Sequence, residues 1–145
     1  MSAVRVFVDS DVVISSLISQ KGVAHLLLFT KISQSVKFYL SNFSLKEQRV
    51  VIERLKINHK NHASLVKKRL TLIELKSSLR AIKKNYQSYV NDLDDAHIVS
   101  GAKKAKAGFL ITYNQKDFKK EEVKKDFGII ILSPGLFLQY LRSIN

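Results

Sequence analysis

Short apolar runs alternate along the chain with longer segments whose apolar residues recur at helical spacing. The runs are rich in β-branched and aromatic residues and predict strands buried on both faces, at residues 5–8, 36–40, 108–112 and 129–132. Helices are predicted after Ser10 or Asp11, before Gly128, from Pro134 onward, and across 23–33, 41–56, 61–76 and 92–108. In the segment 61–76, helical spacing places Ala63, Val66, Leu70 and Ile73 on one side, so a single helix is expected there.

This alternation of strands and helices sets the expected fold class. Strands joined by helical crossovers form a parallel sheet with helices on both faces. The chain has 145 residues, of which 46% are hydrophobic, enough for the core of one domain spanning residues 1–145. We therefore predict an α/β fold, a three-layer α/β/α sandwich with a central parallel sheet of about four to five strands.

The charge of the chain is strongly positive. Lys and Arg number 25 against 12 Asp and Glu, a formal net charge of +13, which indicates a polyanionic partner such as RNA. Between Arg54 and Val90 the only acid is Glu74. A solvated helical face is the other interpretation of this basic stretch. The candidate RNA-binding residues within it are Lys67, Lys68, Arg69, Lys83 and Lys84.

Cysteine usage and the N-terminal sequence bear on location. The chain has no cysteine, which excludes disulfides and a thiolate zinc site and favours a reducing compartment. No secretory signal pattern and no apolar run of membrane-spanning length is present in the sequence. We expect a cytoplasmic protein that does not associate with a membrane.

Acidic residues follow the predicted strands. Asp9 comes directly after the first strand, and Asp117 lies shortly after the third. Asp95 begins the helix that leads into the third strand, and Glu47 lies on the helix after the second. Open α/β sheets bind ligands outside the carboxyl ends of their strands, so these four acids are expected to share one crevice. As an alternative, each has an ordinary role as a helix cap, a first-turn acid or a solvated residue. His97, near the same crevice, is interpreted as a helix-surface residue.

Clustered carboxylates repel one another unless a cation neutralises them. Oxygen ligands without cysteine select a hard ion such as Mg²⁺ or Mn²⁺. Ions of this kind support phosphoryl-transfer chemistry, and a basic surface beside them suits hydrolysis of a nucleic-acid backbone. The acids and the excess of lysine together favour a metal-dependent nuclease.

Four segments resemble the PIN domain nucleases, a family that includes VapC-type toxins. The similar segments are "VFVDSDVVIS", "YLSNFSLKEQRVVIERL", "DLDDAHIVSGAKKAKAGFLITYNQKDF" and "GIIILSPGLFLQYL". The resemblance implies a Mg²⁺- or Mn²⁺-dependent ribonuclease that cuts within RNA. It also implies the toxin of a type II toxin–antitoxin pair, with an antitoxin as partner and self-association as a homodimer.

The resemblance also implies roles for individual residues. Asp11 stands where the family commonly has Asn, so it either adds a negative charge to the pocket or turns away as a helix cap. Asn114 occupies a position often taken by Asp. The implied catalytic residues are Asp9, Glu47, Asp95 and Asp117, of which Asp9, Asp95 and Asp117 bind metal, with Ser10, Asp11, Thr112 and Asn114 as supporting polar groups.

Two alternatives remain open at this point. The first is a PIN-like domain that has lost activity and binds RNA or protein, which the residues at positions 11 and 114 permit. The second is a haloacid-dehalogenase-type phosphatase, because "VFVDSDVV" also fits an Asp-x-Asp signature in which Asp9 would be the nucleophile. The short chain and the lack of a later Lys and paired-Asp motif argue against the phosphatase.

Overall fold

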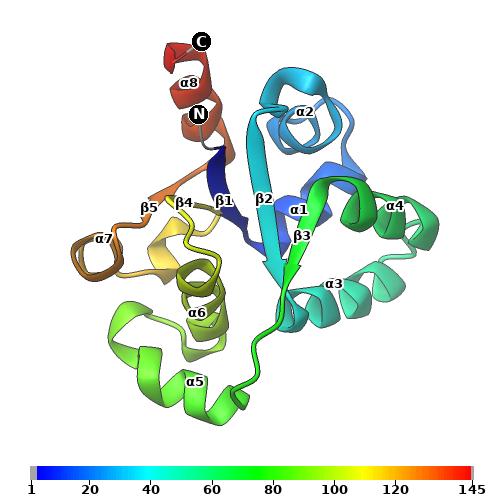
Figure 1. Ribbon diagram of the computed structural model, residues 1–145. Coiled ribbons are helices and arrows are strands. Elements are labelled where there is room, and N and C mark those ends of the chain that lie inside the picture. Colours follow the sequence, from blue (N-terminus) through cyan, green and yellow to red (C-terminus); the bar gives the residue numbers. More distant parts are fainter. Residues whose placement is uncertain (1–2, 145) are drawn as a thin grey trace.

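Five parallel strands form the central sheet of the computed structural model, which describes residues 3–144 (Figure 1). The strand order is β3-β2-β1-β4-β5, and every pairing is parallel. Parallel strands need helical crossovers, and each strand is connected to the next through at least one helix. The strands are β1 (Val4–Val8), β2 (Val36–Ser41), β3 (Leu70–Ile73), β4 (Phe109–Ile111) and β5 (Ile130–Leu132).

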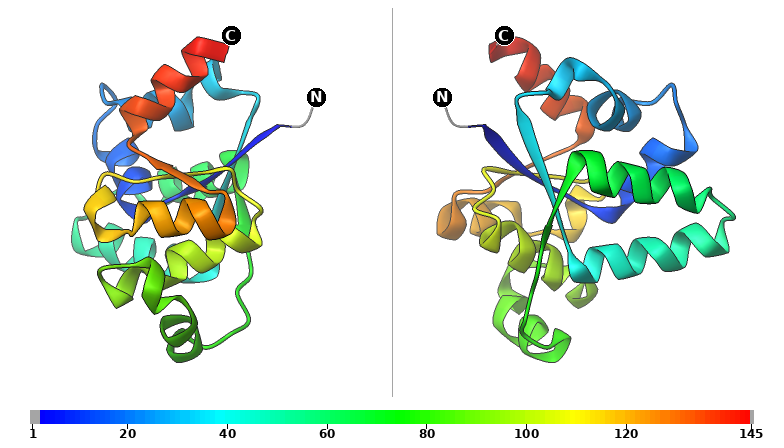
Figure 2. Two further views of the ribbon diagram at one scale, coloured as in Figure 1. Left: turned by 90° about the vertical axis from the view of Figure 1, so that its left-hand side faces the viewer. Right: turned by 45° about the vertical axis from the view of Figure 1, so that its right-hand side comes forward.

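Helices cover both faces of this sheet (Figure 2). Val6 and Val8 of β1 face the core formed with α1, α2, α4 and α8, whereas Phe7 faces the core formed with α5, α6 and α7. This period of two follows from the pleat of the strand. The helices are α1 (Ser10–Ile18), α2 (Val23–Phe29), α3 (Asn42–Arg54), α4 (His59–Arg69), α5 (Leu79–Tyr86), α6 (Ala96–Lys104), α7 (Lys120–Phe127) and α8 (Pro134–Ile144). The predicted three-layer α/β/α sandwich is confirmed.

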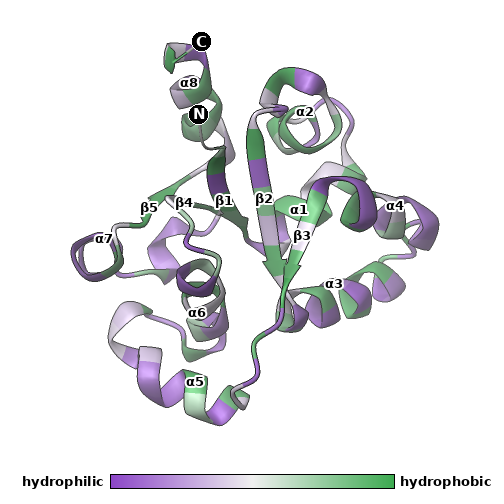
Figure 3. Cartoon of the chain, in the orientation of Figure 1, coloured by the Kyte–Doolittle hydropathy of each residue, from purple (hydrophilic) through white to green (hydrophobic). Residues whose placement is uncertain are grey.

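Polar and apolar residues divide between the layers as the sequence pattern predicts. Hydrophobic residues dominate the strands, and hydrophilic residues gather on the outer helices such as α4 and α7 (Figure 3). Among residues 3–144, no single helix is long and apolar enough to cross a membrane; only α1 and α2 taken together, at a 95° bend, have the length and composition. Both of these helices bury apolar side chains in the core.

The prediction of one helix across 61–76 is wrong from residue 70 onward. Helix α4 ends at Arg69, and residues 70–73 form the edge strand β3, which pairs with β2 through Phe38↔Leu70 and Leu40↔Leu72. Leu70 and Ile73 are three residues apart, which fits one face of a helix, whereas on the strand they face opposite sides of the sheet. An edge strand with Thr71 and Leu72 exposed lacks the buried pattern that marks the central strands.

The carboxyl ends of β1 and β4 lie next to each other in the sheet. Val8 is in register with Ile111, and the Asp9 N–H donates to the Ile111 carbonyl at 3.0 Å. The residue that follows each strand, Asp9 or Thr112, is therefore placed at one edge of the sheet by backbone pairing alone. Helix α6 approaches the same strands closely because Gly101 lies against the buried ring of Phe7.

Substituting Gly101 tests this packing. A Cβ on Gly101 would lie 2.6 Å from Cζ of Phe7, so Gly101→Ala must displace a fully buried ring. We expect the free energy of unfolding to fall by about 1 to 3 kcal/mol, the scale of overpacking. Urea denaturation measures it, with Gly108→Ala as the matched control, because a Cβ there meets nothing within 4 Å. Equal stability of the two variants would contradict the packing.

Candidate active site

Asp9 is a buried carboxylate at the junction of β1 and α1. Its backbone is extended, with φ −67° and ψ 151°, and it occupies the N-cap position of α1. The Ser10 N–H donates to Oδ1 at 2.7 Å, and the Thr112 hydroxyl donates to Oδ2 at 2.9 Å. Asp9 is only 9% exposed, and Thr112 is fully buried. Both oxygens are thus held in one orientation at the carboxyl edge of the sheet.

Asp11 turns toward the loop after β4. Its Oδ2 accepts from the Tyr113 N–H at 3.0 Å and from the Asn114 side-chain amide at 3.1 Å. The Thr112 hydroxyl lies 3.4 Å from the same oxygen and has the shorter contact to Asp9. The Oδ1 atom of Asp11 is buried and has no hydrogen-bond partner among residues 3–144. Asp11 therefore adds a carboxylate beside Asp9, and one of its oxygens is buried without a donor among the described residues.

Glu47 is part of a hydrogen-bond chain that connects α4, α3, α1 and α6. His62 Nε2 donates to Gln48 at 2.9 Å, Gln48 donates to the Ser10 hydroxyl at 3.2 Å, and this hydroxyl lies 3.5 Å from Glu47 Oε1. His97 Nε2 donates to Glu47 Oε2 at 3.1 Å. The side chain of Glu47 is 48% exposed, whereas that of His97 is 5% exposed. Hydrogen bonds from buried partners thus hold the accessible carboxylate of Glu47 in one orientation.

The position of His97 corrects one sequence-based interpretation. His97 is buried in the site and contacts Glu47; it is not a surface residue of α6. Its Nδ1 atom is buried and has no partner in the described part of the chain. Gln48 was not a candidate in the sequence. The sequence feature that could have identified Gln48 is its position directly after Glu47, on a helix that follows a strand.

Asp95 and Asp117 complete the set of predicted acids. Asp95 lies at the N-cap position of α6, yet its side chain makes no capping hydrogen bond. Asp117 lies in the short 3₁₀ turn Gln115–Asp117 that follows β4. Both are half-buried. The side chain of Asp95 therefore stays available for another role, whereas Asp94 forms an ion pair with Lys83 at 3.2 Å.

The pKa values indicate that these acids act on one another. Burial raises the pKa of Asp9 well above its usual range, the charge of Asp11 adds to this, and Asp95 contributes further. The pKa of Asp11 is raised by burial, with a smaller effect of Asp117. Burial raises the pKa of Asp95 to about 7, with contributions from Asp117, Asp92 and Glu47. Acids from four separate segments thus share one electrostatic field, as expected from the strand order.

The donor set suits a hard divalent cation. The candidate ligands are all carboxylate oxygens, several have raised pKa values, and Asp11 has an unpaired buried oxygen. Among residues 3–144, however, no three acidic or imidazole side chains lie close enough together to hold an ion as they stand. Ion binding therefore requires the half-buried carboxylates to rotate toward Asp9.

The predicted basic residues are divided between two places. Lys67 and Lys68 are exposed at the end of α4, which leads into the amino end of β3. They therefore lie at the amino ends of the parallel strands, whereas Asp9 lies at the carboxyl ends. Lys83 and Lys84 lie on α5, on the same side as the acids, and Lys83 is paired with Asp94. Arg69 stabilises the fold.

The guanidinium of Arg69 is occupied by contacts within the protein. It donates to the carbonyls of Leu28 at 3.1 Å, Leu27 at 3.4 Å and Ser33 at 3.4 Å, and to the Ser33 hydroxyl at 3.0 Å. It also lies over the Phe38 ring, 5.4 Å from the centroid. Because these acceptors use its donors, we leave Arg69 out of the RNA-binding surface proposed below.

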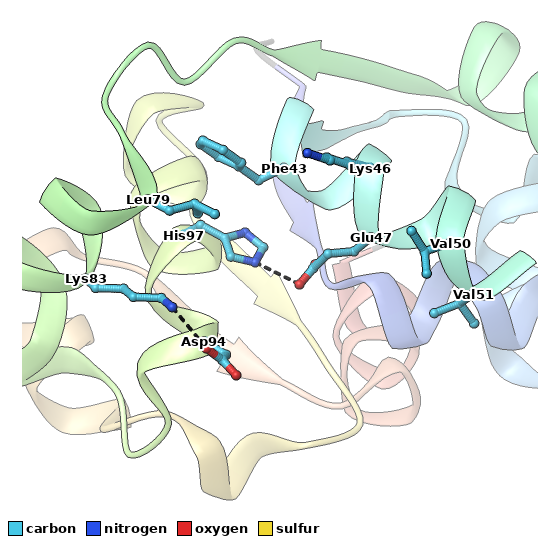
Figure 4. A pocket seen from close by; sticks show the side chains of 9 residues that line it. All are labelled: Phe43, Lys46, Glu47, Val50, Val51, Leu79, Lys83, Asp94 and His97. Atoms are coloured by element: carbon cyan, nitrogen blue, oxygen red, sulfur yellow. Dashed lines mark hydrogen bonds and ion pairs between the residues drawn. The ribbon is translucent and has the colours of Figure 1, made fainter. Parts of the chain in front are cut away.

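A cleft of about 500 Å³ opens next to Glu47, between α3, α5 and α6 (Figure 4). Glu47 and His97 lie where the cleft meets the carboxylates, and the Lys83–Asp94 ion pair lies at its other side. Glu47, the lysine-bearing helix α5 and this cleft thus lie next to one another, whereas the lysines of α4 lie elsewhere.

The comparisons with known proteins agree with this geometry. A model of the PIN domain family matches residues 5–116, a range that contains Asp9, Glu47 and Asp95 and ends one residue before Asp117. No curated protein sequence matches significantly.

Two solved structures share the fold. One is VapBC2 from Rickettsia felis bound to a DNA fragment from its promoter, with TM-score 0.60 and 14% identity, covering 89% of this chain and 98% of that one. The other is PAE2754 from Pyrobaculum aerophilum, with TM-score 0.60 and 16% identity, covering 99% and 94%. The family model spans well over half of the chain and three of its four predicted catalytic acids, and the protein therefore belongs to the PIN domain family.

Proposed function

We propose that this protein is a metal-dependent ribonuclease that cuts within RNA. The observation that carries the proposal is the convergence of the buried Asp9 with the half-buried Asp11 and Asp95, all with raised pKa values, beside an unpaired oxygen of Asp11. Such a cluster is unstable when fully ionised unless a cation is present. The net charge of +13 and the exposed lysines of α5 favour a polyanionic substrate next to it.

Asp9, Asp95 and Asp117 are the proposed ligands of a Mg²⁺ or Mn²⁺ ion. Such an ion supplies positive charge that polarises a phosphoryl group and lowers the pKa of water. The Thr112 hydroxyl and the Ser10 N–H keep the Asp9 carboxylate pointing to one place. Asn114 and the Tyr113 N–H do the same for Asp11, which we propose as a supporting residue.

Glu47 is the proposed acceptor of the proton from the attacking water. It is the predicted acid that combines exposure with a fixed orientation, because His97 and Ser10 contact its two oxygens. The water oxygen bonds to phosphorus, its proton passes to Glu47, and the leaving oxygen takes a proton from solvent. Ser10 and His97 position this carboxylate, and neither needs to contact substrate.

A toxin role is the proposed biological setting. VapBC2 of Rickettsia felis shares the fold, and its structure holds a DNA fragment from its promoter. By analogy, this chain would be the toxin of a type II pair in the cytoplasm, with an antitoxin as partner and a homodimer as the assembled form. The strongly basic surface supports this proposal, because it suits an acidic inhibitor segment as well as RNA.

An inactive PIN domain that only binds RNA or protein remains a second candidate. It is favoured by the lack of three ligating side chains close together among residues 3–144. The phosphatase alternative loses its support, because membership of the PIN family accounts for the same Asp-x-Asp letters.

Replacing Asp9 separates activity from stability. Asp9→Asn should lower Mg²⁺-dependent cleavage of a fluorescent RNA at least about a hundredfold, the scale of removing a catalytic group. The same variant should keep or increase the free energy of unfolding measured in urea, because its neutral side chain removes the cost of burying a charge and the repulsion from Asp11, which together raise the pKa of Asp9. Undiminished cleavage by a folded variant would exclude the nuclease proposal.

The raised pKa of Asp95 predicts how stability depends on pH. The folded protein binds this proton more tightly than the unfolded chain, so the contribution of Asp95 to stability is fully present below pH 4 and is lost as the pH rises through the folded pKa of about 7. Mn²⁺ should raise the melting temperature far more at pH 8 than at pH 5, because it binds the ionised acids. Asp95→Asn should flatten the pH profile and weaken the response to Mn²⁺.

Glu121→Gln on α7 is the control for that experiment, because this acid lies outside the cluster. It should retain the wild-type pH profile and the wild-type response to Mn²⁺. A wild-type melting temperature that Mn²⁺ leaves unchanged at pH 8 would support the inactive binding module instead.

The two lysine pairs predict where RNA lies. Lys83→Ala combined with Lys84→Ala should weaken RNA binding and lower the slope of log affinity against log salt by roughly one per lysine. Lys67→Ala combined with Lys68→Ala should change the affinity for a short RNA little, because these side chains lie at the opposite edge of the sheet. Fluorescence anisotropy over a salt series measures both. Equal losses from the two double variants would contradict this placement.

A further inference from the structure

The cleft beside Glu47 has an apolar interior that the proposed chemistry leaves unused. Phe43, Val50 and Val51 of α3 line one part of it, and Leu79 of α5 lines another. In Figure 4, Phe43 and Leu79 lie on one side of the His97–Glu47 pair, and Val50 and Val51 lie on the other side. With a volume of about 500 Å³, the cleft falls in the range of small-molecule sites.

Part of this apolar lining is exposed to water. Val50 is 60% exposed and Leu79 is 42% exposed, and the ring of Phe43 is half-buried. Covering such side chains releases free energy in proportion to the apolar area removed from water. An aromatic ring at the wall also offers a stacking surface for a planar ligand.

Two lysines and two acids, Lys46, Lys83, Glu47 and Asp94, are the charged residues that line the cleft, besides His97. Lys46 and Lys83 lie at the rim, and the acid that faces Lys83 is Asp94, which this lysine neutralises at 3.2 Å. Helix α5 also carries Arg80 and Lys84 and contains no acid. An apolar interior with Lys46 at its rim, and with further cations on α5, fits a ligand that has a planar apolar part and a phosphate attached to it.

We propose that this cleft is a subsite for one unpaired nucleobase of the RNA substrate. The inference rests on the proposed ribonuclease function and deepens it. The base lies between Phe43 and Leu79, its phosphates face Lys46 and Lys83, and the next phosphate along the strand reaches the carboxylates past Glu47. The subsite thereby makes the enzyme select single-stranded RNA, because a paired base cannot enter the cleft.

An abasic scan coupled to a cleft variant tests this assignment. The full chain is titrated, without divalent ions, into short fluorescent oligouridylate and oligoadenylate, and then into versions in which one nucleotide at a time lacks its base. We expect one abasic position to weaken binding to the wild type about tenfold, the scale of losing one stacked base. Leu79→Ser should weaken binding of the intact RNA roughly fivefold and be nearly insensitive to the same abasic position.

Leu136→Ser on α8 is the matched control. Leu136 is 46% exposed, a fraction similar to the 42% of Leu79, and it does not line the cleft. It should bind both RNAs as the wild type does. The subsite would be overturned if an abasic position weakened binding equally in the wild type and in Leu79→Ser. It would also be overturned if Leu79→Ser and Leu136→Ser bound RNA with equal affinity. In that case a protein partner would be the better candidate for the cleft.

A parallel cleavage assay distinguishes this inference from the function on which it rests. If the RNAs are cleaved in an Asp9-dependent way, but no abasic position affects the wild type and Leu79→Ser differently, only the base subsite is overturned. Absence of both RNA binding and cleavage by the wild type overturns the ribonuclease proposal and the subsite with it.

Discussion

Repulsion among buried carboxylates is the constraint on which the site depends. Asp9 has lost most of its contact with water, and the neighbouring charges of Asp11 and Asp95 raise its pKa further. Hydrogen bonds from Thr112 and from the Ser10 N–H offset only part of this cost. The folded chain must therefore bind protons or a cation at this edge of the sheet. The same property makes the protein less stable at neutral pH and prepares it for a divalent ion.

The fold produces this proximity by three separate means. Register between β1 and β4 puts Asp9 beside Thr112. Local turn structure after β4 brings Asn114 and the Tyr113 N–H to Asp11. The absence of a side chain at Gly101 lets α6 lie against Phe7, so the start of α6, where Asp95 lies, approaches the end of β1. Each is a backbone effect, and the acids are accordingly far apart in sequence.

The sequence predicted the elements whose buried residues recur in a regular pattern, and it was less informative for the elements without such a pattern. Apolar runs identified the central strands, and the tendency of open sheets to bind ligands beyond the carboxyl ends of their strands then placed Asp9 and Asp95 near each other, as their electrostatic interaction shows. Residues 70–73 were misjudged because an exposed edge strand has no buried face to reveal its period. The burial of His97 and the internal contacts of Arg69 were missed for another reason: their partners, Glu47 and the Leu28 carbonyl, lie 50 and 41 residues away, and no local pattern encodes such contacts.

Helix α3 connects the proposed chemistry to the proposed recognition. Phe43, Glu47 and Val50 follow one another at intervals of four and three residues, so they lie on one face of the helix. A base seated against Phe43 would thus contact the same helix face that carries the proton acceptor. Since His97 fixes Glu47 from a buried position, movement of α3 would shift the base and the carboxylate together. The cost of keeping His97 buried, with its Nδ1 unpaired, is consistent with a role in maintaining this alignment.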